Sequence, residues 1–198
     1  MAHPRLLALC GSARKDSFNR LALAVAITGA QRAGAEVTFV EPREFVMPLY
    51  DGDLEASDGL PEAAIRLQQL FAEHDGVIVA TPEYNGFFTP LLKNTLDWVS
   101  RPLPGGTGQP GTIHLRGKPA GLVTASPGAL GGIRAMQHAR LYLSNLGLVV
   151  VPEQAAVSAA NKVLGVDGSV SDDRTLGMLE SVGAAVSKLA AALGTRAG

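Results

Sequence analysis

Five short apolar segments recur along the chain, and they constrain its fold more than any other feature. Each spans four to six residues and is mostly hydrophobic at consecutive positions, without regular alternation of polar and apolar side chains. A strand of this kind is buried on both faces, which is typical of a parallel sheet covered by helices. The predicted strands are residues 6–10, 36–40, 76–81, 119–124 and 148–151.

Segments with helical spacing of apolar residues lie between these strands and after the last one, and the final helix begins near Asp172. Alternating strands and helices with right-handed crossovers can be wound in few ways. We expect an α/β fold of the flavodoxin-like type, a three-layer sandwich with a five-stranded parallel sheet in the order 2-1-3-4-5. No linker or repeat divides the chain, so residues 1–198 are predicted to form a single domain whose last four residues fray.

Composition excludes several classes of function. The chain has 17 basic and 18 acidic residues without a run of either sign, which gives no reason to expect nucleic acid or an anionic membrane as a partner. One cysteine and four histidines without ligand spacing predict neither a disulfide nor a metal site. The first strand leaves no room for a signal peptide, and no uninterrupted apolar run approaches a membrane span, so a cytoplasmic protein is expected.

The loop that follows the first strand is rich in hydrogen-bond donors. Between Gly11 and the next helix it offers two serine hydroxyls, the guanidinium of Arg14, the amide of Asn19 and backbone N–H groups at a helix start. A loop with such donors favours a phosphate group as its ligand. A simpler alternative is that Ser17 or Asn19 only caps the helix.

Spacing argues against two other anion-binding loops. A dinucleotide-binding turn needs three glycines, whereas Gly11 stands alone, and Glu41 follows it by 30 residues where a ribose-binding acid is expected after about 20. We interpret Glu41 as a loop carboxylate. Cys10 could be a phosphatase nucleophile, but Asp16 occupies the position that a Cys-x5-Arg loop requires for arginine.

Polar, glycine-containing loops follow the first, third and fourth strands, whose carboxyl ends adjoin in the expected order. The winding reverses between strands 1 and 3, and ligands bind at such a point. The loop at 82–86 contributes a proline, a tyrosine and backbone amides, and the loop at 126–132 has little side-chain bulk. The pattern predicts a long ligand with a phosphate at one end and a flat ring at the other, and flavin mononucleotide (FMN) matches that shape.

Three motifs carry a family resemblance. G-S-x-R-x-x-S-x-N at 11–19, P-E-Y-N-x-x-x-x-P-L-L-K-N-x-L-D-W-x-S-R-P at 82–102 and G-K-P at 117–119 resemble the NADPH-dependent FMN reductases, which include quinone, chromate and azo reductases. The resemblance implies an enzyme that passes electrons from NADPH or NADH through FMN to a small acceptor such as a quinone, an azo dye, chromate or free flavin. The FMN-binding residues that it implies are Ser12, Arg14, Ser17, Phe18, Asn19, Pro82, Glu83, Tyr84, Asn85, Gly86, Ser126 and Gly128.

The resemblance also implies a homodimer or homotetramer with the flavin near a subunit boundary. The helix that starts at Pro90 carries a second apolar stripe of Leu91, Thr95 and Trp98, which fits either deep burial within the chain or a partner subunit. The glycine- and proline-rich stretch at 101–118 is predicted to be a loop or a lid, and its part at 103–111 is longer than expected for the family.

No side chain here carries a hydride, so we assign the redox chemistry to the cofactor and none to a catalytic residue. Tyr84 is interpreted either as a wall for the ring or as a general acid, and Glu83 either as an ion-pair partner, with Arg101 as a candidate, or as a proton donor. A non-enzymatic FMN electron carrier is the main alternative function, although such carriers are strongly acidic. A phosphoester-binding module without flavin is a third.

Overall fold

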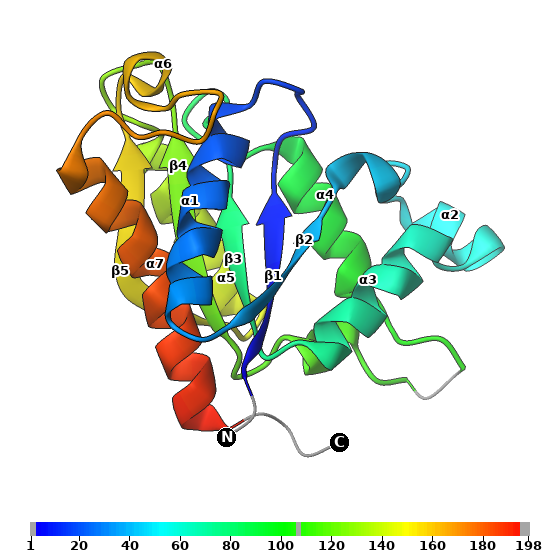
Figure 1. The fold of residues 1–198 in the computed structure, drawn as a ribbon. Helices are drawn as coiled ribbons and strands as arrows, with labels where there is room; N and C mark the ends of the chain where they lie inside the picture. Colours follow the sequence, from blue (N-terminus) through cyan, green and yellow to red (C-terminus); the bar gives the residue numbers. More distant parts are fainter. Residues whose placement is uncertain (1–2, 106–107, 195–198) are drawn as a thin grey trace.

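The computed structural model describes residues 3–105 and 108–194 (Figure 1). All neighbouring strands of its five-stranded sheet are parallel, in the order β2-β1-β3-β4-β5. The predicted fold class and strand order are therefore confirmed. The elements are β1 (Arg5–Cys10), α1 (Phe18–Arg32), β2 (Glu36–Val40), η1 (Pro42–Glu44), α2 (Gly52–Asp58), α3 (Glu62–Glu73), β3 (Gly76–Ala80), α4 (Pro90–Val99), η2 (Gly111–His114), β4 (Pro119–Ala125), α5 (Ile133–Asn145), β5 (Val149–Val157), α6 (Ala160–Val163) and α7 (Asp173–Leu193).

Each face of the sheet has its own apolar core, because successive side chains of a strand point to opposite faces. Leu6 and Ala8 of β1 pack in the core beneath α1 and α7, whereas Leu7 and Leu9 pack in the core beneath α3, α4 and α5. The three layers are visible in Figure 1, where α1 and α7 cover one face of the sheet. The continuous apolar strands of the sequence are thus explained by burial on both faces.

Helix α7 is the one helix in the described ranges that is long and apolar enough to cross a membrane. The sequence expectation considered only uninterrupted apolar runs and did not identify it. In the structure Leu179, Val182 and Val186 of α7 are fully buried in the core that α7 shares with α1 and the sheet. One face of α7 therefore belongs to that core.

The segment between β2 and α3 is more ordered than the single long connection predicted from the sequence. It contains η1 and α2. Asp51 is the N-cap of α2, and its carboxylate accepts hydrogen bonds from the backbone N–H groups of Asp53 and Leu54 at 2.7 and 3.4 Å. No residue of α2 is buried. A helix without an apolar face lacks the pattern on which the prediction relied.

Strand β5 continues to Val157, beyond the predicted end at residue 151. Its register against β4 shifts between Ala120 and Leu122, so β5 bulges around Pro152. An edge strand tolerates such a bulge, and it also tolerates a proline, which has no N–H to donate. In the sequence alone, however, the proline indicates the end of the strand. The short helix α6 that follows was also not predicted.

The segment after α4 does not cover the loops at the carboxyl ends of the strands. Backbone hydrogen bonds join Leu103 to Gln109 and Gly111 to Arg101, each at 2.8 Å. Figure 1 shows this segment at the opposite end of the sheet from the loops that follow β1, β3 and β4. The lid interpretation is therefore wrong for this chain, because α4 carries the segment away from those loops. The expected fraying at 195–198 lies outside the described residues.

Candidate functional site

The loops that follow β1, β3 and β4 form one cleft at the carboxyl edge of the sheet. Its volume is about 160 Å³. The residues that line it are Ser12, Arg14, Ser17, Phe18, Asn19, Pro82, Glu83, Tyr84, Ala125, Ser126 and Pro127. The structure thus brings together most of the predicted site residues, which come from three distant parts of the chain.

Three predicted residues lie outside the lining of this cleft. Asn85, Gly86 and Gly128 belong to the same loops but are not among its walls. Ala125 and Pro127 line it and were not predicted, because an alanine at a strand end and a proline carry no chemical signal in a sequence. These two residues contribute backbone atoms and shape to the cleft.

The β1 loop is held in place by Gly11. Its N–H donates to the carbonyl of Ala80 at 2.7 Å, and its own carbonyl accepts from the hydroxyl of Thr89 at 2.7 Å. A Cβ at Gly11 would lie 2.9 Å from that hydroxyl oxygen and 3.2 Å from Cβ of Leu92. Glycine is therefore required where the β1 loop meets the start of α4.

The start of α1 offers donors to a ligand. Ser17 is the N-cap, and its hydroxyl accepts from the N–H of Arg20 at 3.4 Å. The N–H groups of Ser17, Phe18 and Asn19 have no acceptor in the part of the chain that the structure describes. Together with the guanidinium of Arg14, these N–H groups fit an anion such as a phosphate. The capping alternative is correct for Ser17, but one cap leaves the other donors available.

Asn19 makes a connection that the sequence did not reveal. Its amide nitrogen donates to the carbonyl of Ala125 at 2.8 Å, and its amide oxygen accepts from the N–H of Ala125 at 2.9 Å. The side chain thereby joins the start of α1 to the end of β4, and it is 3% exposed. One amide hydrogen remains for a ligand.

The β3 loop is a tight turn. Tyr84 and Phe87 exchange two backbone hydrogen bonds of 2.8 and 3.1 Å, and Asn85 and Gly86 between them have φ values of 54° and 86°. Two central residues with positive φ are typical of a type I′ turn, for which Asn-Gly is the preferred pair. The turn presents the ring of Tyr84 beside the cleft, 49% exposed.

Glu83 forms an ion pair, as predicted, but its partner is Arg134 and not Arg101. Its carboxylate accepts from Nε of Arg134 at 2.7 Å and from the N–H of Ala135 at 3.3 Å, at the start of α5. Burial alone would raise the pKa of Glu83, but these hydrogen bonds and the charge of Arg134 outweigh it and hold the pKa below its usual value. Arg101 instead donates through Nε to Glu55 of α2 at 2.8 Å. The sequence could not reveal either pair, because both join segments far apart in the chain.

The β4 loop closes the opposite side of the cleft. The hydroxyl of Ser126 accepts from the N–H of Gly128 at 3.1 Å, and the N–H of Ser126 donates to the carbonyl of Val157 at 3.0 Å. Ser126 is therefore anchored to β5, while Gly128 orients its hydroxyl. This explains how Gly128 serves the cleft without lining it.

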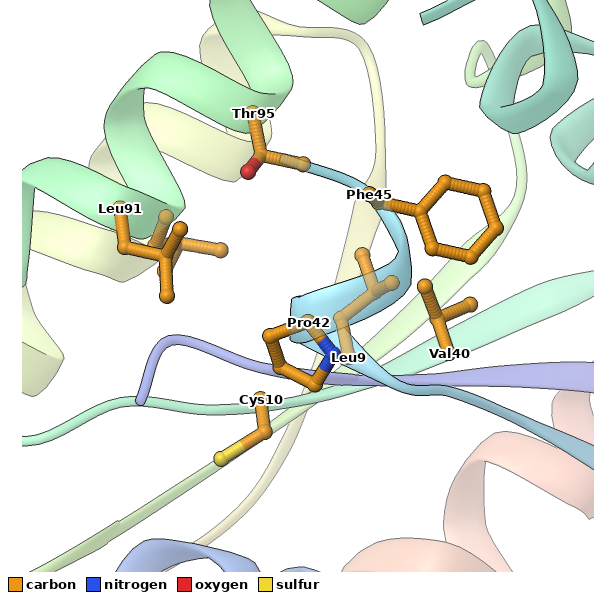
Figure 2. Close-up of a pocket in the computed structure, with 8 residues that line it drawn as sticks. Leu9, Cys10, Val40, Pro42, Phe45, Leu91 and Thr95 are labelled. Carbon is orange, nitrogen blue, oxygen red and sulfur yellow. The ribbon is translucent and has the colours of Figure 1, made fainter. Parts of the chain in front are cut away.

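A second, smaller cavity of about 20 Å³ lies under the turn at 42–45 (Figure 2). Its walls are largely apolar, and they include Leu9, Phe45 and Leu91. Figure 2 shows the side chain of Cys10 turned away from Leu91 and Thr95. Burial raises the pKa of the Cys10 thiol, which disfavours the thiolate that a phosphatase would need. The cavity is a packing gap, and a role for Cys10 as a nucleophile finds no support.

The second stripe of α4 is largely covered by the chain itself. Trp98 is fully buried, donates through Nε1 to the carbonyl of Pro48 at 2.8 Å and meets the ring of Tyr50 edge-on at 5.0 Å. Deep burial is thus the correct interpretation for Trp98. Leu91 and Thr95 remain partly exposed.

Within the described residues, no group of three or more histidine, cysteine, aspartate or glutamate side chains is placed to hold a metal ion. The chemistry of the cleft instead rests on hydroxyls, an amide, a guanidinium and backbone N–H groups, all of which donate hydrogen bonds. This set of donors fits the phosphate of FMN. The exposed ring of Tyr84 offers a surface for the flat ring of the same ligand.

Comparisons with known proteins identify the family of the chain. Residues 4–162 match the family model of NADPH-dependent FMN reductases. The chain is 37% identical over 174 residues to a quinone reductase of Escherichia coli, covering 87% of both, and 34% identical over 147 residues to a 2-hydroxy-1,4-benzoquinone reductase of a Burkholderia species, covering 74% of both. The structure of FerB, a flavoenzyme NAD(P)H:acceptor oxidoreductase of Paracoccus denitrificans, superposes with a TM-score of 0.79 at 29% identity and covers 96% of this chain and 98% of FerB. The chain therefore belongs to the NADPH-dependent FMN reductase family of flavin-dependent oxidoreductases.

Proposed function

We propose that this protein transfers electrons from NADPH or NADH to a small quinone, using FMN bound in the cleft between the β1, β3 and β4 loops. The observation that carries the proposal is the convergence of Ser12, Tyr84 and Ser126 on one cleft. Two relatives above 30% identity are named for quinone substrates, which supports a quinone as the acceptor.

The β1 loop would bind the phosphate of FMN. Ser12 and Ser17 are each 5% exposed, so their hydroxyls are fixed by packing, while Arg14 is exposed and supplies positive charge. The free N–H groups at the start of α1 add donors at the positive end of the helix. Asn19 would contribute its remaining amide hydrogen and keep this loop against β4.

The β3 and β4 loops would bind the ring. Pro82, Glu83 and Tyr84 form one border, which the turn at Asn85 and Gly86 supports, and Ser126, whose hydroxyl Gly128 orients, lies on the other. FMN, when bound, accepts a hydride from reduced nicotinamide and passes electrons to an acceptor. The role of the protein is to orient the reactants and to place donors near the ring, and we assign no catalytic side chain.

We further propose that the protein acts as a homodimer or homotetramer in the cytoplasm, without a nucleic-acid or membrane partner. Tyr84 and Phe87 are 49% and 47% exposed beside the cleft, and Phe87 stacks on His138 at 4.4 Å between ring centroids. An exposed aromatic cluster at the mouth of a ligand site suits a subunit contact.

The proposal is tested with purified protein reconstituted with FMN under anaerobic conditions. NADPH or NADH alone should bleach the visible flavin band, and a benzoquinone should restore it, with turnover under steady-state conditions. Flavin that is bound but not reduced without a protein partner would contradict the enzymatic function and support the electron-carrier alternative. Protein that takes up no FMN would contradict both.

A further inference from the structure

The turn that follows β5 holds the loop that follows β4, and we call this turn, residues 158–160, the clamp turn. It donates three hydrogen bonds, one from each residue, to carbonyl oxygens of the β4 loop. The pairs are Oγ of Ser158 with Ala129 at 2.7 Å, the N–H of Ala159 with Gly128 at 3.2 Å, and the N–H of Ala160 with Ser126 at 3.0 Å. Because Ala160 is fully buried, the carbonyl of Ser126 is directed into the protein and not into the cleft.

Ala159 has an unusual backbone conformation. Its φ of 46° and ψ of 40° lie in the left-handed region, which a residue with a Cβ rarely adopts. This conformation places the N–H groups of Ala159 and Ala160 on the same side of the chain, so both can donate to the β4 loop. In the described part of the chain, the one other non-glycine residue with a positive φ is Asn85, in the turn beside the cleft. Strain of this kind is frequent at functional sites.

The clamp turn acts on the cleft through Ser126. Ser126 lines the cleft, and its hydroxyl oxygen accepts a hydrogen bond from the N–H of Gly128. The clamp turn binds the carbonyls of both residues, so the position of this hydroxyl is fixed. Among the described residues the hydroxyl proton has no acceptor, and it is therefore available to a ligand in the cleft.

We propose that the clamp turn is a positioning element, which holds the hydroxyl of Ser126 as a hydrogen-bond donor to the flavin ring and thereby raises the reduction potential of bound FMN. This inference rests on the proposed function and extends it to the electron affinity of the site. The ring of FMN is richer in electrons when reduced, so a donated hydrogen bond stabilises the reduced form more than the oxidised form. A released β4 loop would lose this donor and free carbonyl oxygens beside the ring. Loosening the clamp turn should therefore favour oxidised FMN.

The first test is the midpoint potential of the FMN-loaded protein, measured by anaerobic reductive titration against a reference dye. Ser158→Ala removes the 2.7 Å hydrogen bond to Ala129. The affinity for reduced FMN relative to oxidised FMN should fall about threefold or more, which lowers the potential of a two-electron couple by about 14 mV. Ser158→Thr keeps the hydroxyl and should have the potential of the wild type.

The matched control is Ser181→Ala. It removes an exposed hydroxyl of α7 that donates to the carbonyl of Met178 at 2.8 Å, and it should leave the potential unchanged. A potential in Ser158→Ala equal to that of the wild type would overturn the role of the clamp turn.

The second test asks whether Ser158 acts through Ser126. Ser126→Ala should lower the potential by itself, and Ser158→Ala added to it should lower the potential little further. Fully additive effects of the two substitutions would overturn the coupling.

The third test separates the ring from the phosphate of FMN. The ratio of FMN affinity to riboflavin affinity should be the same in Ser158→Ala as in the wild type, because the β1 loop is untouched. A fall in that ratio would show a general loosening of the cleft and would overturn the proposal. Wild-type protein that takes up no FMN would instead contradict the proposed function, whereas FMN that binds and is reduced by NADPH at a potential insensitive to Ser158→Ala would contradict this inference alone.

Discussion

The amide of Asn19 and the backbone of Ala125 form a reciprocal pair of hydrogen bonds, 2.8 and 2.9 Å long, across 106 positions of the chain. The pair fixes the start of α1, whose N–H groups we propose as phosphate donors, against the end of β4, which leads into the loop that we propose as a border of the flavin ring. Two walls of the cleft are thereby positioned before any ligand binds. Preorganisation of this kind lowers the entropic cost of binding.

Asn19→Ala should therefore weaken both the fold and the site. Loss of two buried hydrogen bonds should lower the free energy of unfolding of the FMN-free protein by about 2–4 kcal/mol. The measurement is urea denaturation at neutral pH. Thr28→Ala is a matched control, since it removes a side chain to backbone hydrogen bond on an exposed face of the same helix. A variant of Asn19 as stable as the wild type would show that the pair has no structural role.

Gly11→Ala should destabilise the protein even though alanine is small. The added Cβ would lie 2.9 Å from Oγ1 of Thr89 and 3.0 Å from Oγ1 of Thr81, inside normal contact. We expect a loss of about 1–3 kcal/mol in the free energy of unfolding, as for other overpacked sites. Adding Thr89→Ser to Gly11→Ala keeps a hydroxyl at position 89, so the close contact remains. The double variant should therefore recover little of the lost free energy of unfolding. Gly177→Ala, at a helix position with no atom within 4 Å, is the control and should not destabilise.

Glu83 should make stability depend on pH in the acidic range. Its pKa is lowered in the folded protein, so its contribution is present above the unfolded value, near 4.3 in model peptides, and is lost as pH falls through the folded value. Glu83→Gln should be less stable than the wild type at pH 7 by about 1–2 kcal/mol, and the difference should shrink below pH 4. Thermal denaturation across pH 3–7 measures it.

The corresponding control is Glu73→Gln. Glu73 lies 3.9 Å from Arg5, and both side chains are about half exposed or more, so their attraction is screened by solvent. Its replacement should produce no measurable pH-dependent difference. If the stability difference between Glu83→Gln and the wild type also did not change with pH, the contact with Arg134 would not hold the β3 loop.

Much of the fold could be predicted from the sequence because the strands are short and buried on both faces. The ranges 6–10, 36–40 and 76–81 differ from the structure by one residue at most, since burial dominates their composition. Helix α2 and the second half of β5 were missed because neither has a continuous apolar pattern. α2 is stabilised by its cap and by the Glu55–Arg101 pair, and β5 is a bulged edge strand.

The candidate site was predictable as three loops but not as a set of contacts. Ser12, Tyr84 and Ser126 follow strands whose order was correct, so their convergence followed from the fold. The partner of Glu83 and the second role of Asn19 depend on the exact placement of α5 and β4. Such pairings are set by tertiary packing, and no local pattern encodes them.

The central claim is that the β1 loop recognises the phosphate of FMN. The most direct measurement compares FMN with riboflavin, which has the same ring and no phosphate, by calorimetric titration of the flavin-free protein. FMN should bind at least about a hundredfold more tightly, in line with several charge-assisted hydrogen bonds, and Arg14→Ala should lose about tenfold in FMN affinity while riboflavin binding stays unchanged. Equal affinity of the wild type for FMN and riboflavin would contradict the account.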